Sequence, residues 1–259
     1  MNKVLAIANV TVKELYRRKD FYVLFVLSAL IILVAGSANF FNDDKIVRYL
    51  KELCLLLIWI SALVIAVTTA ARQIPNEREQ RTIFPLLAKP VTRGQVIAGK
   101  FLGCWLATGL ALVAFYLFLG VVSGSREHAW PVLNYFQAAW LQWMFLGVVI
   151  AMAMLGSIVF AAPSSNSTIL IIVVIGILLL GGHLNQVALE QSEPMRSVTY
   201  TIYFLIPHLE WFDVRDLVVH DQGLIAWWAV AAASVYALIY AALFLFAAWV
   251  VFRRKALNI

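Results

Sequence analysis

Long apolar runs separated by short charged segments dominate the chain. A helix needs about 20 mostly apolar residues to cross the ~30 Å hydrocarbon core of a bilayer. We expect six transmembrane helices, at 21–41, 53–71, 101–122, 135–162, 168–182 and 224–252. The fifth run is short and ends at two glycines, and the apolar residues 184–189 suggest that it continues after a bend.

The charged segments between the runs predict an orientation. If the N-terminus is inside, the inner segments hold 14 of the 20 Lys and Arg residues and the outer segments hold 6. Cytoplasmic loops of membrane proteins carry the excess of Lys and Arg. We therefore expect both termini to lie in the cytoplasm.

Residues 1–20 form a separate amphipathic segment before the first run. On a helix, Lys13 and Arg17 fall outside an apolar stripe that consists of Val4, Leu5, Ala8, Val12, Leu15 and Tyr16. A helix of this kind lies in the plane of the membrane interface with its apolar face in lipid. We expect an interfacial helix at the inner surface.

The outer segment 183–223 is the longest stretch between two spans. Pro194 and Pro207 interrupt it, and its apolar centre at 199–206 is too short to cross a bilayer. The pattern predicts a re-entrant or interfacial helix there.

Composition agrees with a membrane protein and leaves little room for other classes. Hydrophobic residues make up 63% of the chain and charged residues 13%, whereas soluble domains are about 45–50% apolar and about 25% charged. The net charge of +6 is explained by basic loops beside anionic lipid, so we expect no nucleic-acid partner. The first run is too long for a signal peptide, and the 259 residues suit one transmembrane domain, 1–259.

The chain offers little for catalysis or for cofactors. Residues 94–100 match most of the phosphate-binding pattern GxxxxGK[ST], but Phe101 replaces its final hydroxyl residue. The apolar runs contain essentially no ionisable residues, which an intramembrane enzyme would need. We therefore expect no enzyme activity, and no cofactor bound by this chain.

Two cysteines and four histidines remain. Cys54 and Cys104 fall in apolar runs and are expected to be small buried hydrophobes. No two histidines have the i, i+4 spacing of a preformed helical metal site, so we expect no metal; the four are His128, His183, His208 and His220.

Small residues recur at helical spacing in the third run. Gly99, Gly103 and Ala107 form one set, and Gly120 and Gly124 form another. Such spacing allows close approach of a neighbouring helix. Packing within the chain is the first interpretation, and a dimer interface is the alternative.

The inner loop 72–100 is the most informative segment. It is charged, then apolar, then turned by Pro90, then basic again. Residues 75–88 are expected to form a short surface helix with Ile83, Leu86 and Leu87 on one side. From the residues alone, an ordinary interfacial loop with solvated charges is the favoured interpretation.

This loop resembles that of the ABC-2-type permeases, which are membrane subunits of ATP-binding cassette transporters and mostly exporters. The resemblance rests on Glu77-x-x-x-Arg-Thr-x-x-x-Leu-Leu-Ala-x-Pro-x-x-Arg93, followed by Gly99 and Lys100. The amphipathic N-terminal helix, the six runs and the enlarged segment 183–223 are similar to the family too. Many members have Gly where this chain has Arg81.

The resemblance implies that a short cytoplasmic coupling helix in this loop docks on a separate ATP-binding subunit, which binds the ATP and Mg²⁺. The residues implied in this contact are Pro75, Glu77, Arg78, Glu79, Thr82, Ile83, Phe84, Leu87, Pro90 and Arg93. A second permease chain and membrane lipid are further implied partners, and the implied place is the cell membrane. The expected activity is export of an unidentified, amphipathic substrate.

A second hypothesis gives the loop the same coupling role without transport. In that case the chain passes ATP-driven force to an assembly outside the membrane, and the outer segment 183–223 is the surface on which an extracytoplasmic protein docks.

Overall fold

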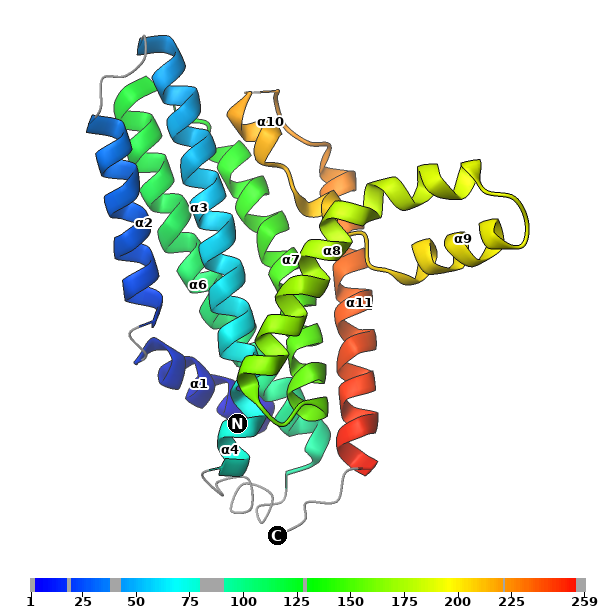
Figure 1. Ribbon diagram of the computed structural model, residues 1–259. Helices are drawn as coiled ribbons and strands as arrows, with labels where there is room; N and C mark the ends of the chain where they lie inside the picture. The colour runs from blue at the N-terminus through cyan, green and yellow to red at the C-terminus, as the bar shows by residue number, and fades with distance from the viewer. Residues whose placement is uncertain are drawn as a thin grey trace.

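A computed structural model describes residues 3–17, 20–37, 43–79, 91–127, 130–220 and 222–254. These residues form helices joined by short connections, without a β-strand among them (Figure 1). In chain order the elements are α1 (Lys3–Tyr16), α2 (Asp20–Ser37), α3 (Asp43–Ala71), α4 (Gln73–Glu79), α6 (Arg93–Glu127), α7 (Val132–Val159), α8 (Pro163–Glu190), α9 (Met195–Leu205), the 3-10 helix η1 (Leu209–Phe212), α10 (Arg215–Val219) and α11 (Trp227–Arg254).

Five of the expected spans are confirmed as helices that are long and apolar enough to cross a membrane. They are Arg48–Glu77, Arg93–Ser125, Val132–Val159, Pro163–Gly181 and Trp227–Arg254. The first expected span, 21–41, overlaps α2 and its shorter apolar stretch Tyr22–Ile31. Because residues 38–42 lie outside the described part of the chain, a sixth crossing remains a prediction.

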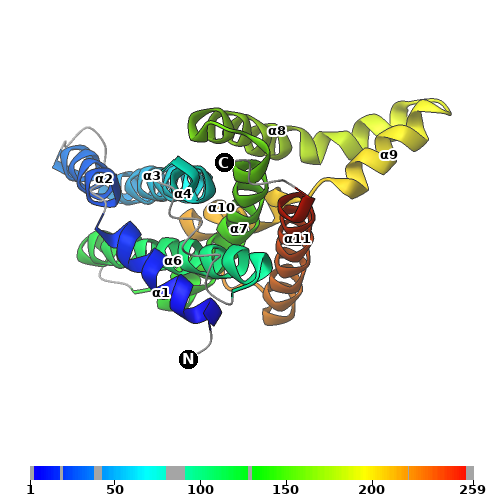
Figure 2. The ribbon, with the colours of Figure 1, turned by 90° about the horizontal axis from the view of Figure 1, so that it is seen from below.

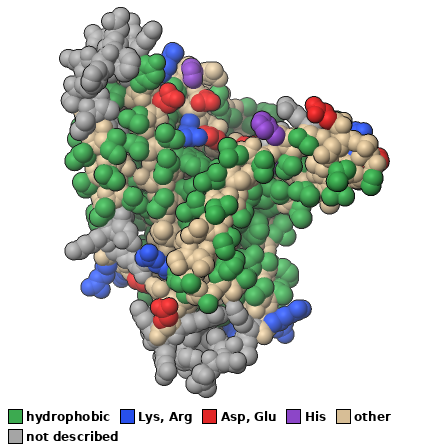
Figure 3. Space-filling view, in the orientation of Figure 1, with side chains coloured by type: hydrophobic (Ala, Val, Ile, Leu, Met, Phe, Trp, Pro, Cys, Tyr) green, Lys and Arg blue, Asp and Glu red, His purple; other side chains and the backbone are tan. Residues whose placement is uncertain are grey.

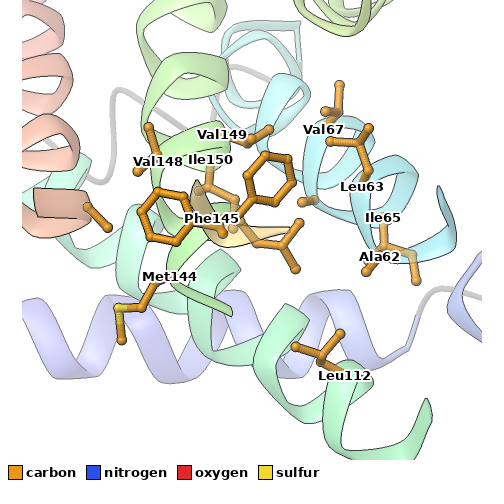
Figure 4. Close-up of a cluster of buried hydrophobic side chains, with 14 of the residues drawn as sticks. Ala62, Leu63, Ile65, Val67, Leu112, Met144, Phe145, Val148, Val149 and Ile150 are labelled. Carbon is orange, nitrogen blue, oxygen red and sulfur yellow. The ribbon is translucent and has the colours of Figure 1, made fainter. Parts of the chain in front are cut away.

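Helix α7 lies at the centre of the bundle, where it contacts α3, α6, α8 and α11 (Figures 1 and 2). In its most apolar window 72% of the residues are buried, against 22% in α8 and in α11. Figure 4 shows Phe145 of α7 among side chains that include Leu63 of α3 and Val149 of α7. The outer surfaces of α8 and α11 are therefore the ones left for lipid or for another chain.

Buried and partly buried polar side chains join α7 to its neighbours. The Gln137 amide donates to the carbonyl of Ile225 at 2.9 Å and accepts from its N–H at 3.0 Å, which fixes the segment before α11. The indoles of Trp105 and Trp143 stack with ring centroids 4.5 Å apart, and each donates to the other's carbonyl. These bonds satisfy polar groups that have no water to bind in a bilayer.

Helix α1 runs across α6 near the end of the bundle (Figure 2). It fits closely because a Cβ at Gly99 would lie 2.7 Å from Cβ of Ile7, and one at Gly103 would lie 2.6 Å from Cβ of Thr11. The expected packing role of Gly99 and Gly103 is confirmed, and the partner is a helix of the same chain.

The predicted apolar stripe of α1 needs one correction. Thr11 was outside the stripe and is buried against α6, whereas Leu5 and Tyr16 belong to it and are exposed. The apolar residues therefore serve two faces, one packed on α6 and one open. Sequence periodicity gave one broad stripe because it does not show which side a neighbouring helix will cover.

The two ends of the bundle differ from its middle. Charged side chains gather at both ends, and hydrophobic side chains cover the band between them (Figure 3). Helices α1 and α4 and the C-terminal end of α11 lie at one end, whereas α10 lies at the other (Figure 1). This fits two termini on the same side of a membrane, and which side is cytoplasmic remains a prediction. The end with α1 and α4 is named the inner end and the end with α10 the outer end, after that prediction.

The outer segment 183–223 forms two parts. Helix α8 continues past Gly181, turns away from the bundle and pairs with α9, so the predicted continuation is confirmed (Figure 1). The helix expected at 199–206 is found as α9, Met195–Leu205. The chain then returns through η1 and α10, whose Leu209, Phe212 and Val218 are buried in the bundle.

Replacing Gly103 with alanine is expected to destabilise the protein by about 1–3 kcal/mol, the usual cost of overpacking, because the new Cβ meets Thr11 and the carbonyl of Ala8. The matched control is Gly120→Ala, since no atom lies within 4 Å of its Cβ position. There we expect no loss, or a gain of about 0.5–1 kcal/mol from helix propensity. Unfolding in detergent, followed by circular dichroism, measures both. Equal losses at the two sites would contradict the close fit of α1.

Candidate functional site

Helix α4 follows α3 after a single turn residue, Arg72, at the inner end of the bundle. Pro75 stands in the first turn of α4, where the missing N–H costs little because first-turn amides have no partner within the helix. Gln73, Ile74 and Pro75 are buried, and α4 contacts α3 and α7. Glu79 at the other end is exposed. The helix is thus anchored by its first turn and presents its last turn outward.

A buried lysine of α6 holds α4 in place. The Lys100 ammonium lies 2.8 Å from Glu77 Oε1 and donates to Gln73 Oε1 at 3.0 Å. The Gln73 amide in turn donates to the carbonyl of Thr69 in α3 at 3.3 Å. One polar chain therefore joins α3, α4 and α6 (this set, Thr69, Gln73, Glu77 and Lys100, is called the Lys100 network below).

The Lys100 network is costly to break. The Lys100 side chain is 4% exposed and that of Glu77 is 23% exposed. Removing one partner of a buried ion pair leaves a buried charge without compensation. Because the pair holds together only in one arrangement of the three helices, a displacement of α4 must carry α3 and α6 with it or disrupt the network.

The start of α6 is fixed independently. Thr92 and Gln95 form a capping box, in which each side chain accepts from the other's backbone N–H. Arg93 donates to the carbonyls of Phe252 and Arg253 at 2.6 and 3.2 Å, and its guanidinium lies over the Phe252 ring. A cation suits the carbonyls that end a helix. Arg93 thereby joins α6 to the end of α11.

The structure brings some of the residues implied by the resemblance together and separates others. Pro75, Glu77 and Glu79 lie on α4, together with the backbone of Arg78, whereas Arg93 lies at the start of α6 beside α11. Of the surface helix expected at 75–88, residues 75–79 are helical as part of α4, and residues 80–88 lie outside the described part of the chain. The remaining implied residues, Thr82, Ile83, Phe84, Leu87 and Pro90, lie outside the described part of the chain.

Two contacts were not foreseen from the sequence. Glu77 and Arg93 were expected to face a partner subunit, and the structure gives both of them partners within the chain. Lys100 was considered as part of a phosphate-binding pattern, but residues 94–100 form the first turns of α6. A lysine at the mouth of an apolar helix was the one available signal, and 23 residues separate it from Glu77, so spacing did not point to the pair.

The outer end carries a second polar cluster. The Arg215 guanidinium forms two bonds with the Asp213 carboxylate, at 2.6 and 2.8 Å, and lies over the Trp59 ring of α3. Burial by itself raises the pKa of Asp213, but the hydrogen bonds and the charge of Arg215 outweigh it and hold the pKa below its usual value. This pair attaches the start of α10 to the bundle.

The histidines are spread over the outer end. His208 is buried between the rings of Tyr203 and Trp211 and lies 3.2 Å from Glu210. His183 and His220 are exposed on α8 and after α10, and His128 lies outside the described residues. Among the residues that the structure describes, no three His, Cys, Asp or Glu side chains gather as a metal site.

Comparison with known proteins bears on almost the whole chain. A family model described as ABC-2 family transporter protein matches residues 5–257. A search of curated proteins finds no match. The matched range includes the Lys100 network, the loop after α4 and the outer segment 183–223.

We expect Glu77→Gln to destabilise the protein by about 1–3 kcal/mol, the cost of a lost charged hydrogen bond in a buried place, because Lys100 loses its anionic partner. Glu79→Gln is the matched control on the same helix, and as an exposed site it should change stability by no more than about 0.5 kcal/mol. Denaturant unfolding in detergent measures both. Adding Lys100→Gln to Glu77→Gln should lower the free energy of unfolding by less than Lys100→Gln does in the wild-type chain. If the effects of the two substitutions were fully additive, this would argue against the pair.

Asp213→Asn is expected to lower the free energy of unfolding at neutral pH by up to about 1 kcal/mol, as for a half-exposed ion pair. Because the folded-state pKa of Asp213 is lowered, this stabilisation is present above the unfolded pKa of about 3.9 and is lost as the pH falls through the folded value. The difference from wild type should therefore be the same at pH 6 and pH 8 and shrink only below about pH 4. A difference that varies between pH 6 and pH 8 would contradict the assignment.

Proposed function

Because the chain belongs to the ABC-2 family of transporter proteins, we propose that it is the permease subunit of an ABC transporter whose ATPase is a separate chain. The observation that carries the coupling role is the Lys100 network, which makes α4 a rigid extension of two spans. The proposed orientation places α4 in the cytoplasm, where ATP is available. The ATP-binding subunit would then meet the end of α4 and the loop that follows it.

The proposed docking surface consists of Glu79 and the loop residues Thr82, Ile83, Phe84 and Leu87. Glu79 is exposed at the last turn of α4, and the apolar residues Ile83, Phe84 and Leu87 follow it by four to eight positions in the sequence. A charged edge beside an apolar patch suits a groove on a protein partner. Glu77 is left out of this surface, because its carboxylate is bound to Lys100 within the chain.

Movement of α4 would reach the spans through the Lys100 network, which pulls on α3 and α6 together. From the start of α6, Arg93 passes the movement on to the last carbonyls of α11. Because Lys100 and Arg93 form short, charged hydrogen bonds, a displacement driven by ATP on the partner would shift three spans as a unit.

The proposed activity is export of an amphipathic substrate by a pair of permease chains. The apolar windows of the five confirmed spans hold no more than two charged residues each, which favours ATP-driven movement over coupling to protons or ions. Helices α8 and α11 leave most of their surface open, and this surface is available to lipid or to the second chain.

A specific observation keeps the second hypothesis open. The hairpin of α8 and α9 projects sideways from the bundle (Figure 1), and no residue of α9 is buried. An exposed apolar helix at the proposed outer surface suits a protein partner outside the membrane as well as lipid. In that function the same coupling at α4 would move the hairpin and the partner bound to it.

The test of the coupling role is affinity purification of the tagged chain from native membranes. We expect the wild type to retain an ATP-binding subunit, recognised in the eluate by mass spectrometry and by ATP hydrolysis. The variant Glu79→Ala/Ile83→Asp/Leu87→Asp should lose at least about nine-tenths of it. A desolvated charge in an apolar contact costs more than about 1.4 kcal/mol, and that free energy corresponds to a tenfold loss of affinity. A control variant, Glu190→Ala/Glu193→Ala, removes exposed charges at the other end of the bundle.

The outcomes separate the two functions as well. Unchanged ATPase retention in the triple variant, with normal gel filtration, would contradict the docking surface. Retention of the ATPase together with a soluble extracytoplasmic protein that is lost on deleting 191–206 would favour force transmission over export.

A further inference from the structure

Two apolar cavities lie against α1, on either side of its contact with α6. The smaller, about 290 Å³, is lined by α1, α3 and α6. The larger, about 660 Å³, is lined by α1, α6 and α7 and is called the α1 groove below. Val12 of α1 and Leu110 of α6 line both. An apolar cavity of about 150 Å³ already holds benzene, so the α1 groove has room for a long hydrocarbon.

The polar groups in the walls of the α1 groove are already used. The Trp143 indole donates to the carbonyl of Trp105, and the Trp140 indole donates to Ser234. The other residues from α6 and α7 in the lining are apolar, with Val113 and Phe136 among them. The walls from α6 and α7 therefore offer carbon surface and no free donor, which suits a hydrocarbon chain and not a polar ligand.

The groove opens sideways from the bundle. Leu110, Val113 and Phe136 line it and are 59%, 55% and 53% exposed. They belong to spans that cross the bilayer, so the medium at this opening is lipid hydrocarbon and water is excluded from it. The occupant must come from the membrane.

Charge along α1 indicates the kind of headgroup. Asn9 lines the groove at its edge, and Lys13 and Arg17 follow at i+4 and i+8 on neighbouring positions of the same side. All three are exposed. Because α1 lies across the end of the spans, these groups stand at headgroup level while the groove extends along the spans toward mid-bilayer. Basic groups at a membrane surface attract anionic lipids.

We propose that the α1 groove is a binding site for an anionic phospholipid, with an acyl chain between α1, α6 and α7 and the phosphate beside Lys13. The lipid belongs to the leaflet in which α1 lies. Its chain fills the space that the crossing of α1 over Gly103 leaves open, so the lipid completes the attachment of α1 to the bundle. A second protein chain or an exported molecule in the groove are the other outcomes of the test.

The experiment is native mass spectrometry of the delipidated full chain titrated with phosphatidylglycerol or with phosphatidylcholine of the same acyl chains. We expect one phosphatidylglycerol to bind at least about fivefold more tightly than phosphatidylcholine. Val113→Trp places an indole in the groove, and Leu117→Trp is its control one turn further along α6, outside the lining. Lys13→Gln tests the headgroup, and Arg196→Gln on α9 makes the same charge change at the other end of the bundle.

The proposal expects Val113→Trp and Lys13→Gln each to weaken phosphatidylglycerol binding about fivefold or more, with both controls close to wild type. Equal binding of the two lipids, or unchanged binding in Val113→Trp, overturns it. A change of oligomeric state in Val113→Trp without a change in lipid binding would assign the groove to a second chain and also overturn it. Ala139→Leu narrows the groove from α7 by fewer atoms and serves in the same way if Val113→Trp misfolds. None of these outcomes depends on the ATPase.

Discussion

The burial of α7 is the constraint on which the rest of the structure depends. Each of the other four confirmed spans contacts this helix, and its buried residues are mainly Ala, Val, Ile, Leu and Met. Water does not drive helices together inside a bilayer, so their association relies on close packing and on satisfied polar groups. The paired Trp105 and Trp143, and Gln137 with the backbone of Ile225, supply those polar contacts.

The two ends of the bundle around α7 differ in how firmly their helices are bound to one another. At the inner end, buried Lys100 ties α4 to α6 and partly buried Arg93 ties α6 to the end of α11, both through charged hydrogen bonds. Such bonds are strong and directional, so this end is suited to passing on a displacement without absorbing it. At the outer end, η1 and α10 are seated in the bundle, while α9 and the C-terminal part of α8 extend away from it. A displacement of α4 would therefore be passed on through rigid contacts to the spans, and the less constrained segment at the other end is the α8–α9 hairpin.

Helix α1 connects this arrangement to the membrane itself. It crosses α6 at Gly99 and Gly103, next to Lys100, and leaves apolar space on both sides of the crossing. A lipid chain in that space would fill a void that no side chain of the described protein fills, and unfilled space next to packed atoms forfeits dispersion contacts. Residues 99–113 of α6 thus carry the contact with α1, the Lys100 network and the α6 wall of the proposed lipid site, so the three are close together along one helix.

The sequence alone determined the class of the protein and most of its elements. Runs of apolar residues predict spans because a bilayer fixes their length, and five were found at the expected places, with ends up to eight residues away (Arg93 against 101). The loop motif predicted the family, which the match over residues 5–257 confirms. These features are local in sequence or set by the solvent, and a pattern along the chain suffices to show them.

Tertiary structure alone decided which residues meet. The partner of Lys100 is Glu77, a residue of the preceding helix with no periodic relation to it, and Arg93 bonds to carbonyls 159 and 160 residues away. Glu77 and Arg93, which the resemblance implied as contacts with another subunit, have bonding partners inside the chain. Likewise, the apolar stripe of α1 did not reveal which side would press on α6 and which would border a groove. Such pairings depend on how the helices cross in three dimensions. The hydrophobic pattern along each helix is compatible with many different crossings and does not select one of them.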